Sequence, residues 1–407
     1  MNRNGQREAG YGVHGKETAT AAYMAALLLV LALAGCAQTA PASNTAPAAS
    51  AGTTVSGVAA SAATDQAASV QEESSAVPDT APDTRIFTDS VGREVELPAQ
   101  IERVALSGPM AQIVVFSLAP DKLVGIASAW DKSAEEYLDT AYYQLPVIGQ
   151  LYGGKGELNL EELLRVDPQV VIDVGEPKNS IVEDLDGLQE QTGVPFVHIT
   201  ATLSTMPEAY TMLGELLGME AEAAERADYC RTVYDNISGK AAGLTKKKVL
   251  FITGEEGLGV IAKDSFHAEV VDLLADNAAV VDEPSSKGTG NEVDLEQLLN
   301  WNPEVILFAP ESIYDRVAEM PEWQALDAIK NGAYYEVPFG PHNWMGFQPS
   351  VQRYLGLQWM MTLLYPEEAE YDLYAQVAEY YRLFYHCELT KEQYEALVAN
   401  SILKDAQ

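Results

Sequence analysis

The chain has 407 residues, 47% of them hydrophobic, and carries a formal net charge of −35 at pH 7. This length exceeds what one ordinary hydrophobic core can organise and predicts two domains of ordinary size. The large excess of acidic side chains repels nucleic-acid phosphates and anionic lipid headgroups, and it tolerates cationic or neutral ligands. We therefore expect no nucleic-acid partner.

Residues 1–35 have the features of a secretory signal. Arg3, Arg7 and Lys16 precede an apolar run at 21–34, which is too short to cross a bilayer core because crossing takes roughly 20 residues. Leu-Ala-Gly then stands directly before Cys36. This order resembles the bacterial lipobox, which implies a lipoprotein signal peptide and lipidation of Cys36. An ordinary signal peptide with an incidental Cys is the alternative.

Residues 36–85 are rich in Ala, Ser, Thr and Pro and poor in large apolar side chains. Such a segment cannot bury enough surface to offset its chain entropy. We expect a disordered tether, anchored to the membrane through the lipid on Cys36 only. Cys230 continues an apolar helical stripe and is expected to be a buried thiol, and whether it pairs with Cys387 stays open.

The segment 86–205 predicts an N-terminal α/β lobe. It opens with a hairpin at 86–98, where apolar and polar residues alternate around a Ser-Val-Gly turn. Short apolar strands then alternate with helices, one of which ends at Pro120. This alternation indicates a parallel sheet covered on both faces. The predicted strands are 103–107, 122–128, 169–175 and 195–200.

Residues 206–245 predict two helices, and 246–407 predict a C-terminal α/β lobe. The first helix, 206–217, stops at Gly218, and the second runs from about 220 to 242. At ~1.5 Å per residue the second helix measures roughly 33 Å, which is long enough to bridge two lobes. The strands expected in the second lobe are 246–253, 258–262, 278–282, 304–310 and 333–339, followed by a helical C-terminus from Val351.

Two sixteen-residue stretches repeat one another, beginning at residues 157 and 292, which lie 135 positions apart, with seven identities. In each stretch a favoured N-cap residue, Asn159 or Asp294, opens a helix with a buried leucine side. Pro168 and Pro303 end the helices, and an apolar strand follows each of them. The chain thus predicts one helix–turn–strand unit in each lobe. Glu162 and Gln297, three positions after the caps, predict two capping boxes.

Glu161 and Glu296 are the identities that packing does not explain. Both are expected at the second helical position, outside the capping box. A carboxylate there can simply complement the helix dipole, which is worth about 0.3–1 kcal/mol. The two carboxylates can also form a matched pair that binds arginines of a partner through bidentate hydrogen bonds. The residues alone leave both interpretations open.

From residue 86 to the C-terminus the chain resembles the class III periplasmic-type solute-binding proteins of the iron-siderophore, haem and vitamin B12 group. The resemblance rests on the motifs at 89–107 and 122–128 and on the two repeated stretches. It implies an α/β fold with two Rossmann-like lobes and mostly parallel central sheets, joined by one long rigid helix, with a ligand cleft between the lobes. It further implies that Glu161 and Glu296 dock on arginines of an ABC permease dimer, which works with its ATPase.

The resemblance places the cleft at the loops that follow the carboxyl ends of the strands. The motif at 339–354 resembles a branch of the family described as iron or metal-chelate binders, and His342 there could ligate a metal or haem. His342 could equally hold a turn, Trp130 and Trp344 could belong to the core, and Arg353 could stabilise its own loop. The candidate ligand contacts are Trp130, Tyr152, Lys155, His342, Asn343, Trp344 and Arg353.

The expected function is that of a lipid-anchored, extracytoplasmic, monomeric protein that captures an iron-chelate type ligand for an importer. No nucleophile elbow, zinc-protease motif or phosphate loop is present in the sequence, so we expect no enzyme and no intrinsic cofactor. A site for a bare metal ion needs several converging His and carboxylate ligands, and no adjacent pair of the few histidines has metal-site spacing. A surface adhesin or sensor built on the same fold, or a binder of a bare metal ion, remains the alternative.

Overall fold

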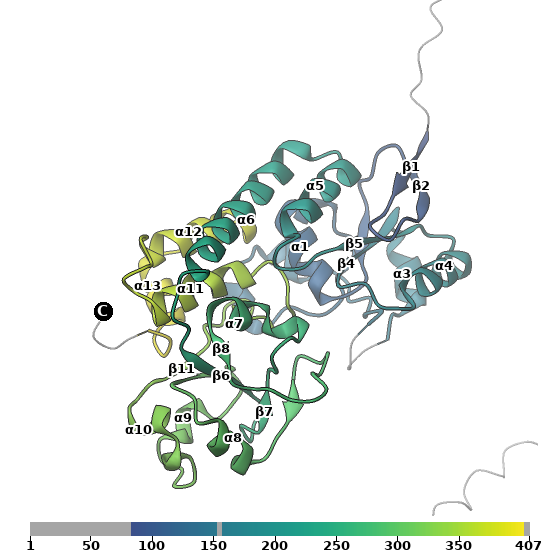
Figure 1. Cartoon of the computed structure of the whole chain (residues 1–407). Helices are drawn as coiled ribbons and strands as arrows, with labels where there is room; N and C mark the ends of the chain where they lie inside the picture. The colour runs from purple at the N-terminus through teal and green to yellow at the C-terminus, as the bar shows by residue number, and fades with distance from the viewer. Residues whose placement is uncertain (1–82, 153–156, 403–407) are drawn as a thin grey trace, which may run out of the picture. The chain divides into compact units, whose positions relative to one another are not determined.

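The computed structural model describes residues 83–152 and 157–402, in which two α/β lobes are joined by helices (Figure 1). The antiparallel hairpin of β1 (Thr84–Thr88) and β2 (Glu94–Pro98) precedes the first lobe, as predicted. Three parallel strands form the sheet of this lobe, in the order β3 (Val104–Leu106), β4 (Val170–Gly175) and β5 (Phe196–Thr200).

The strands of the first lobe are buried on both faces because most of their residues are apolar. Val170, Ile172 and Val174 of β4 pack in the large core together with α1 (Pro109–Leu118), whereas Val171 faces the opposite way. That opposite face is covered by α3 and α4, which contribute Leu163 and Leu185. This period of two is the expected pattern for a parallel sheet between helices. The other helices of this lobe are α2 (Thr140–Tyr143), α3 (Leu160–Val166) and α4 (Ile181–Thr192).

The second lobe contains a sheet with the strand order β11-β10-β6-β7-β9, and β8 pairs with β6. Its central strand β6 is parallel to β10, with Leu250 opposite Ile306 and Ile252 opposite Phe308. The strands are β6 (Lys248–Thr253), β7 (Gly259–Val260), β8 (Asp276–Asn277), β9 (Asn291–Glu292), β10 (Val305–Phe308) and β11 (Tyr334–Glu336). The helices are α7 (Glu269–Leu274), α8 (Leu295–Trp301), α9 (Tyr314–Val317), α10 (Asp327–Lys330), α11 (Arg353–Leu364), α12 (Leu373–Phe384) and α13 (Lys391–Leu397).

Two predicted strands are wrong. Residues 122–128 form only isolated bridges, Val104 with Leu123 and Ile126 with Val147, because a 3-10 turn at 120–122 precedes them. Residues 278–282 lie outside the sheet, where Val280 is 64% exposed, and the pairing with β6 is made earlier, at β8. Both segments are short apolar runs, for which composition alone does not decide between strand and loop.

The helices α5 (Met206–Leu217) and α6 (Glu220–Ala241) connect the lobes as predicted. Gly218 ends α5 in the left-handed conformation, with φ of 65°. A Cβ atom on Gly214 would lie 2.7 Å from the Cβ of Ala223, so the glycine lets α5 and α6 pack closely. Cys230 is buried in α6, as predicted, and it is a free thiol, as is Cys387.

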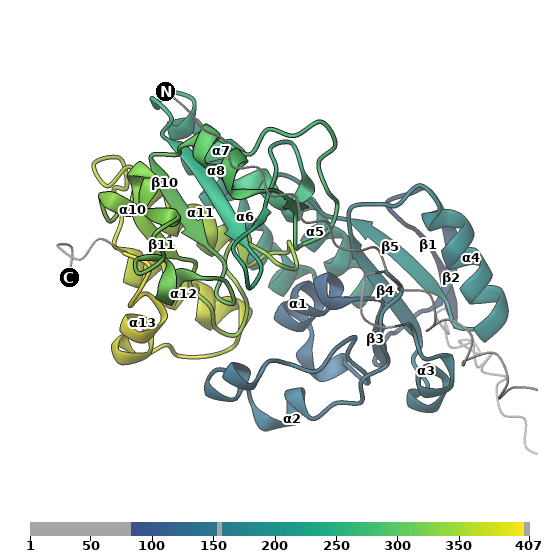
Figure 2. The ribbon, with the colours of Figure 1, turned by 90° about the horizontal axis from the view of Figure 1, so that it is seen from below.

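Arg226 of α6 ties elements of both lobes together. Its guanidinium donates to the carbonyl oxygen of Ser117 in α1 and to that of Leu383 in α12, both at 3.1 Å. Both carbonyls belong to the last turn of a helix, where they carry the negative end of the helix dipole. Arg226 is 6% exposed. Figure 2 shows α1 between the two lobes, close to the region that this contact joins.

The repeated stretches fold alike. Asn159 and Asp294 are the N-caps of α3 and α8, and each side chain accepts a hydrogen bond from the backbone three residues later. Each helix ends at a left-handed residue, Asp167 with φ of 50° or Asn302 with φ of 39°. The repeat therefore specifies the cap, the turn and the start of the next strand in both lobes.

The capping boxes are confirmed only in their first half. Among the described residues, the complete reciprocal arrangement occurs at Thr390 and Gln393 of α13. In α3 the carboxylate of Glu162 instead binds Arg165, with its Oε2 2.8 Å from Nε, and the N–H of Asn159 donates to Ile148. Within residues 83–152 and 157–402 no helix is both long and apolar enough for a bilayer crossing.

We predict that Leu163→Ala and Leu298→Ala each lower the free energy of unfolding by about 2–5 kcal/mol, because each leucine is fully buried at the equivalent position of the repeat. Denaturant titration measures the change. Leu164→Ala is the control, since Leu164 is 50% exposed, and it should cost less than about 1 kcal/mol. Equal losses in the buried and exposed variants would contradict the assignment of these helix faces.

Candidate functional site

Trp130 and His342 are the sequence-predicted candidates that meet across the boundary between the lobes. Their ring centroids are 5.3 Å apart at an interplanar angle of 46°. Trp130 lies in the N-terminal lobe, in the segment after the 3-10 turn at 120–122. Its ring packs edge-on against that of Phe116 in α1, with 5.1 Å between the ring centroids. His342 belongs to the loop after β11 and lies 6.4 Å from the ring of Tyr385. A ligand that bound beside this pair of rings would contact both lobes.

The polar atoms of this pair are enclosed but unsatisfied. His342 Nε2 and Trp130 Nε1 are buried, and neither has a hydrogen-bond partner in the part of the chain that the structure describes. Burial lowers the pKa of His342 from 6.5 to about 4, against the opposing effect of Asp131. The imidazole is therefore neutral at pH 7, and it can accept a hydrogen bond or bind a metal through a ring nitrogen.

Asn343 and Trp344 shape the loop that presents His342. The side-chain oxygen of Asn343 accepts hydrogen bonds from the backbone N–H groups of Met345, at 2.8 Å, and Gly346, at 3.1 Å. Trp344 is fully buried in the large core. Gly346 has φ of 90°, a conformation that a side chain would strain. The contacts of Asn343 and Trp344 thus lie within the loop and the core, and their contact with a ligand stays a prediction.

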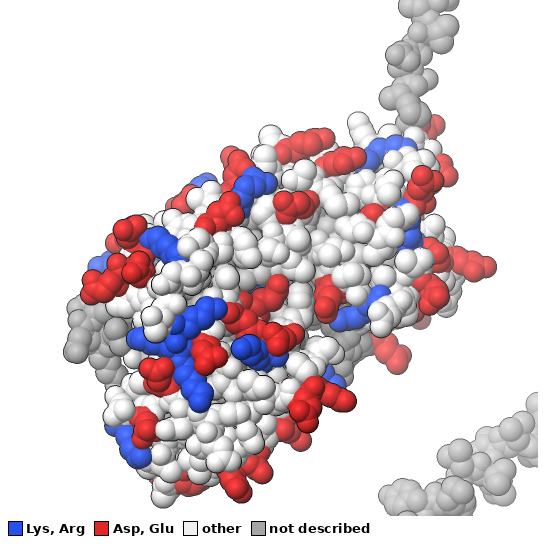
Figure 3. All heavy atoms as spheres, viewed as in Figure 1, with Lys and Arg blue, Asp and Glu red and all other residues white. Residues whose placement is uncertain are grey.

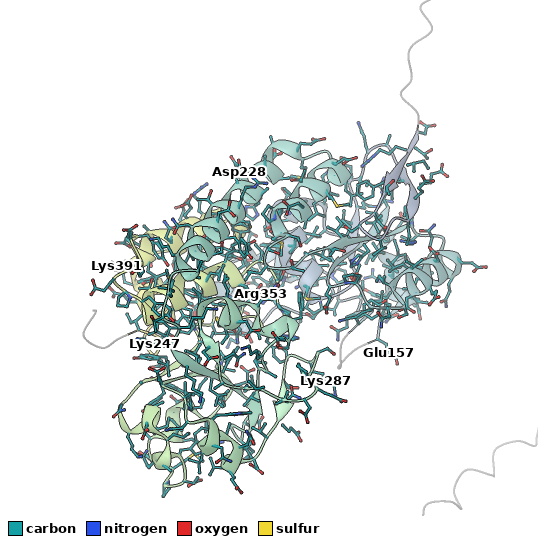
Figure 4. All side chains as sticks on the ribbon, in the orientation of Figure 1. Glu157, Asp228, Lys247, Lys287, Arg353 and Lys391 are labelled. Atoms are coloured by element: carbon teal, nitrogen blue, oxygen red, sulfur yellow. The ribbon has the colours of Figure 1, made fainter. Side chains whose placement is uncertain are left out.

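Arg353, labelled in Figure 4, is fully buried and holds Glu269, which contacts the first lobe. Its guanidinium pairs with Glu269, donates to the carbonyl oxygen of Phe266 at 3.1 Å, and lies 4.9 Å from the ring centroid of Phe266. Glu269 in turn accepts a hydrogen bond, at 3.2 Å, from the backbone N–H of Leu203, which lies near the end of the N-terminal lobe. Tyr354 donates to the carbonyl oxygen of the same Leu203 at 2.6 Å. The alternative of a stabilising role for Arg353 has direct structural support.

Tyr152 lies in the N-terminal lobe, and Lys155, like Cys36, lies outside the described residues. The hydroxyl of Tyr152 donates to the carboxylate of Asp184 at 2.6 Å, and Ser180 donates to the same oxygen at 2.8 Å. Burial and the Asp184 carboxylate raise the pKa of Tyr152, while these two hydrogen bonds lower the pKa of Asp184. Tyr152 is thereby held away from the Trp130–His342 pair.

A polar chain across the first sheet was not anticipated from the sequence. Ser107 donates to one carboxylate oxygen of Asp173, and Nδ1 of His198 lies 2.6 Å from the other. Ser107 directly follows β3, whereas Asp173 and His198 lie within β4 and β5, and the parallel register brings the three residues side by side. The carboxylate lies between the hydroxyl and the imidazole, so the imidazole cannot take the hydroxyl proton as it would in a nucleophilic triad. In the sequence, Asp173 and His198 interrupt the apolar strands β4 and β5, and Ser107 directly follows the apolar strand β3.

A pocket of about 440 Å³ lies beside the Arg353–Glu269 contact. Its walls come from Glu176 and Leu203 of the first lobe, Tyr234 of α6, and residues 264–273 of the second lobe. On the face of the molecule drawn in Figure 3, Asp and Glu side chains gather near the middle, with Lys and Arg side chains beside them. Among the described residues, no group of three or more His, Cys, Asp or Glu side chains is arranged to hold a metal ion.

Glu161 and Glu296 occupy the second position of α3 and α8, as predicted, and both are exposed. Within 83–152 and 157–402 neither carboxylate takes part in a salt bridge, whereas the neighbouring Glu162 is paired with Arg165. In Figure 2 the two helices lie in different lobes, on opposite sides of α1. Both carboxylates are therefore accessible to a partner.

We expect the neutral His342 to make folding depend on pH. Its pKa is lower in the folded than in the unfolded chain, so its contribution is complete above pH 6.5 and is lost as the pH falls to about 4. The loss over this range is on the order of 3 kcal/mol. Denaturant unfolding of the protein and of His342→Gln at pH 7 and pH 4.5 measures it. The variant should lose less stability on acidification, and an identical loss in both proteins would contradict the burial of a neutral imidazole.

Known proteins show the same architecture. A structure of an ABC transporter solute binding protein from Sulfurospirillum deleyianum is 27% identical, covers 77% of this chain and 99% of its own, and superposes with a TM-score of 0.71. The molybdate-bound MolA of Haemophilus influenzae is 19% identical and covers 75% of this chain and 99% of its own. It shares the fold, with a TM-score of 0.61. The high-affinity heme uptake system protein IsdE of Staphylococcus aureus is 27% identical over 240 residues, which are 56% of this chain and 78% of IsdE.

The model of one family matches residues 104–340, more than half of the chain. The matched range begins at β3 and ends in the loop that carries His342, so it includes both sheets, the connecting helices and both repeated units. The two-lobed α/β fold expected from the resemblance is confirmed by these relatives. The chain belongs to the periplasmic binding protein family, whose members capture small solutes outside the cytoplasm for ABC permeases.

Proposed function

We propose that this protein is the lipid-anchored substrate-binding component of an ABC importer, that it binds a metal chelate between its lobes, and that it delivers the chelate to a permease dimer. The observation that carries the proposal is the equivalence of α3 and α8. Both helices have the same cap, the same buried leucine and the same left-handed end, and each presents one exposed carboxylate, Glu161 or Glu296. A partner with twofold-related arginines would match this arrangement.

The chelate assignment rests on the chemistry of His342 and Trp130. A neutral imidazole with an unpartnered Nε2 suits iron or cobalt that has an open coordination position. The indole of Trp130 supplies an aromatic surface for a flat, conjugated ligand. Haem or a corrinoid fits these two features better than a siderophore complex that already fills the coordination sphere of its iron. The similarity to a heme uptake protein supports the same direction.

We predict that the mature protein, with Cys36 replaced, binds haem or cobalamin with a change in metal absorbance and in Trp fluorescence. His342→Ala should lower the affinity by about tenfold or more and remove the absorbance change, because a metal–imidazole bond is lost. The control is His386→Asn, which keeps a residue that tolerates the positive φ of 55° at that position. Wild-type absorbance and affinity in His342→Ala would contradict ligation by this imidazole, and tighter binding of a saturated ferric siderophore would redirect the ligand class.

Charge reversal tests the docking surface. We predict that Glu161→Arg combined with Glu296→Arg abolishes uptake through the importer and leaves the affinity for the chelate unchanged, because both carboxylates are exposed and unpaired among the described residues. The measurement pairs an uptake assay in cells with a ligand titration of the purified variant.

The matched control reverses two exposed carboxylates elsewhere, Glu190→Arg with Glu319→Arg, which changes the net charge equally. That control should transport normally. Normal uptake by the Glu161/Glu296 variant would contradict docking and would favour a surface adhesin or sensor on the same fold. Loss of chelate affinity in that variant would point to a structural role for the two carboxylates.

The remaining parts of the proposal concern delivery and anchoring. We propose cleavage before Cys36, lipidation of its thiol, and a tether over residues 36–85 that keeps the folded body near its permease. Residues 36–82 lie outside the described ones, whereas Thr84 and Arg85 belong to β1, so the tether ends slightly before residue 85. One diacylated cysteine is enough for stable retention on a membrane. We further propose a monomer without enzymatic activity, because each molecule would present one Glu161 and one Glu296 to one permease dimer.

A further inference from the structure

The pocket beside Arg353 is built by both lobes and lies apart from the Trp130–His342 pair. Glu176 and Thr202 come from loops after β4 and β5, whereas Asp264 and Ser265 precede α7 in the second lobe. Its volume of about 440 Å³ is within the range of pockets that hold small organic molecules. Glu269, whose carboxylate pairs with Arg353 behind it, is one of the lining residues.

The walls of this pocket are acidic. Four carboxylates line it, those of Glu176, Asp264, Glu269 and Asp272, and no Lys or Arg side chain is among its lining residues. Glu269 pairs with the buried Arg353, Glu176 lies 3.6 Å from Lys178, and the charge of Lys263 acts on the carboxylate of Asp272. Among the described residues, Asp264 and Asp272 form no salt bridge. Burial raises the pKa of Asp272, because desolvation disfavours the charged form of its carboxyl group.

A second feature is independent of charge. Ser265 is 9% exposed, lines the pocket, and has a buried Oγ without a hydrogen-bond partner in the described part of the chain. A buried hydroxyl left unpaired costs free energy, so the site has a group that a bound molecule can satisfy. Two aromatic rings, Phe266 and Tyr234, complete the wall. Arg353 already lies over the Phe266 ring, which shows that this ring accepts a cation.

We propose that this pocket is a second binding site, distinct from the chelate site, and that it takes a small organic ammonium ion with primary amino groups. A primary ammonium carries three N–H donors, which match the carboxylates and the free hydroxyl, and its alkyl chain suits the aromatic wall. An anionic ligand is disfavoured by the carboxylates of Asp264 and Asp272, which form no salt bridge within the described residues. Because its walls come from both lobes, an occupant would also hold the lobes at their present separation.

Calorimetric titration with 1,4-diaminobutane tests the site directly, with tetramethylammonium as a cation of similar chemistry that lacks N–H donors. The diamine should bind, and it should bind more tightly than tetramethylammonium. Glu176→Gln combined with Asp264→Asn should weaken the diamine by at least about tenfold, because two carboxylate contacts lose their charge. Asn tolerates the φ of 66° at position 264, so the fold should persist. Ser265→Ala should weaken binding by a smaller factor.

The control variant, Glu311→Gln with Asp315→Asn, removes the same charge from an exposed region that does not line the pocket. It should bind the diamine as the unchanged protein does. Equal weakening in both double variants would show a general attraction to an acidic protein and would overturn the site, as would equal affinity for the two cations or no binding. Chelate affinity, measured in the same variants, should stay unchanged, so failure here and failure of the chelate site are separable.

Discussion

The fold depends on how the two lobes are held together beside α6. Arg226 binds the carbonyl ends of α1 and α12, one from each lobe, in a place where water is excluded. A second contact between the lobes is made at Leu203. Glu269 accepts a hydrogen bond from its backbone N–H, and Tyr354 donates one to its carbonyl oxygen. Opening the lobes along this edge would leave buried polar groups unpaired, and each such group costs about 1–3 kcal/mol. We therefore expect only small relative motion of the lobes.

This restriction connects the structure to transport. Glu161 and Glu296 lie on different lobes, so their separation is constant only if the lobes stay nearly fixed. A permease that recognises both carboxylates at once gains from such a constant spacing, because little conformational freedom is lost on docking. The same fastening keeps Trp130 of one lobe over His342 of the other. In the proposed function, ligand capture and docking would thus use the same rigid relationship between the lobes.

The sequence predicted local structure well where the pattern was strong. The repeat at 157 and 292 indicated the caps, the buried leucines and the following strands, and the end of α5 followed from Gly218. Local rules act within a few residues, so these features needed no tertiary information. The short apolar runs at 122–128 and 278–282 failed because strand formation there depends on which neighbour the chain meets.

The candidate site shows the same limit. His342 and Trp130 are 212 positions apart in the sequence, and no periodicity could show that their rings meet. Arg353 illustrates the opposite case, since its charge suggested a ligand contact, while its partner Glu269 lies in a distant helix. The polar chain through Asp173 was hidden because each member looked like an isolated polar residue in an apolar strand. Long-range contacts of this kind depend on the whole fold.

The most direct test of the account is the distance between the two docking helices with and without ligand. Spin labels at Arg165 and Asn300, the equivalent exposed positions of the repeat, report this distance once Cys36 and Cys387 are replaced by Ser and buried Cys230 by Ala. The account predicts a single distance distribution whose peak stays within its own width when haem or cobalamin binds. A ligand-dependent shift beyond that width, or two well-separated peaks, would show lobes that move freely and would contradict a docking pair held at constant spacing.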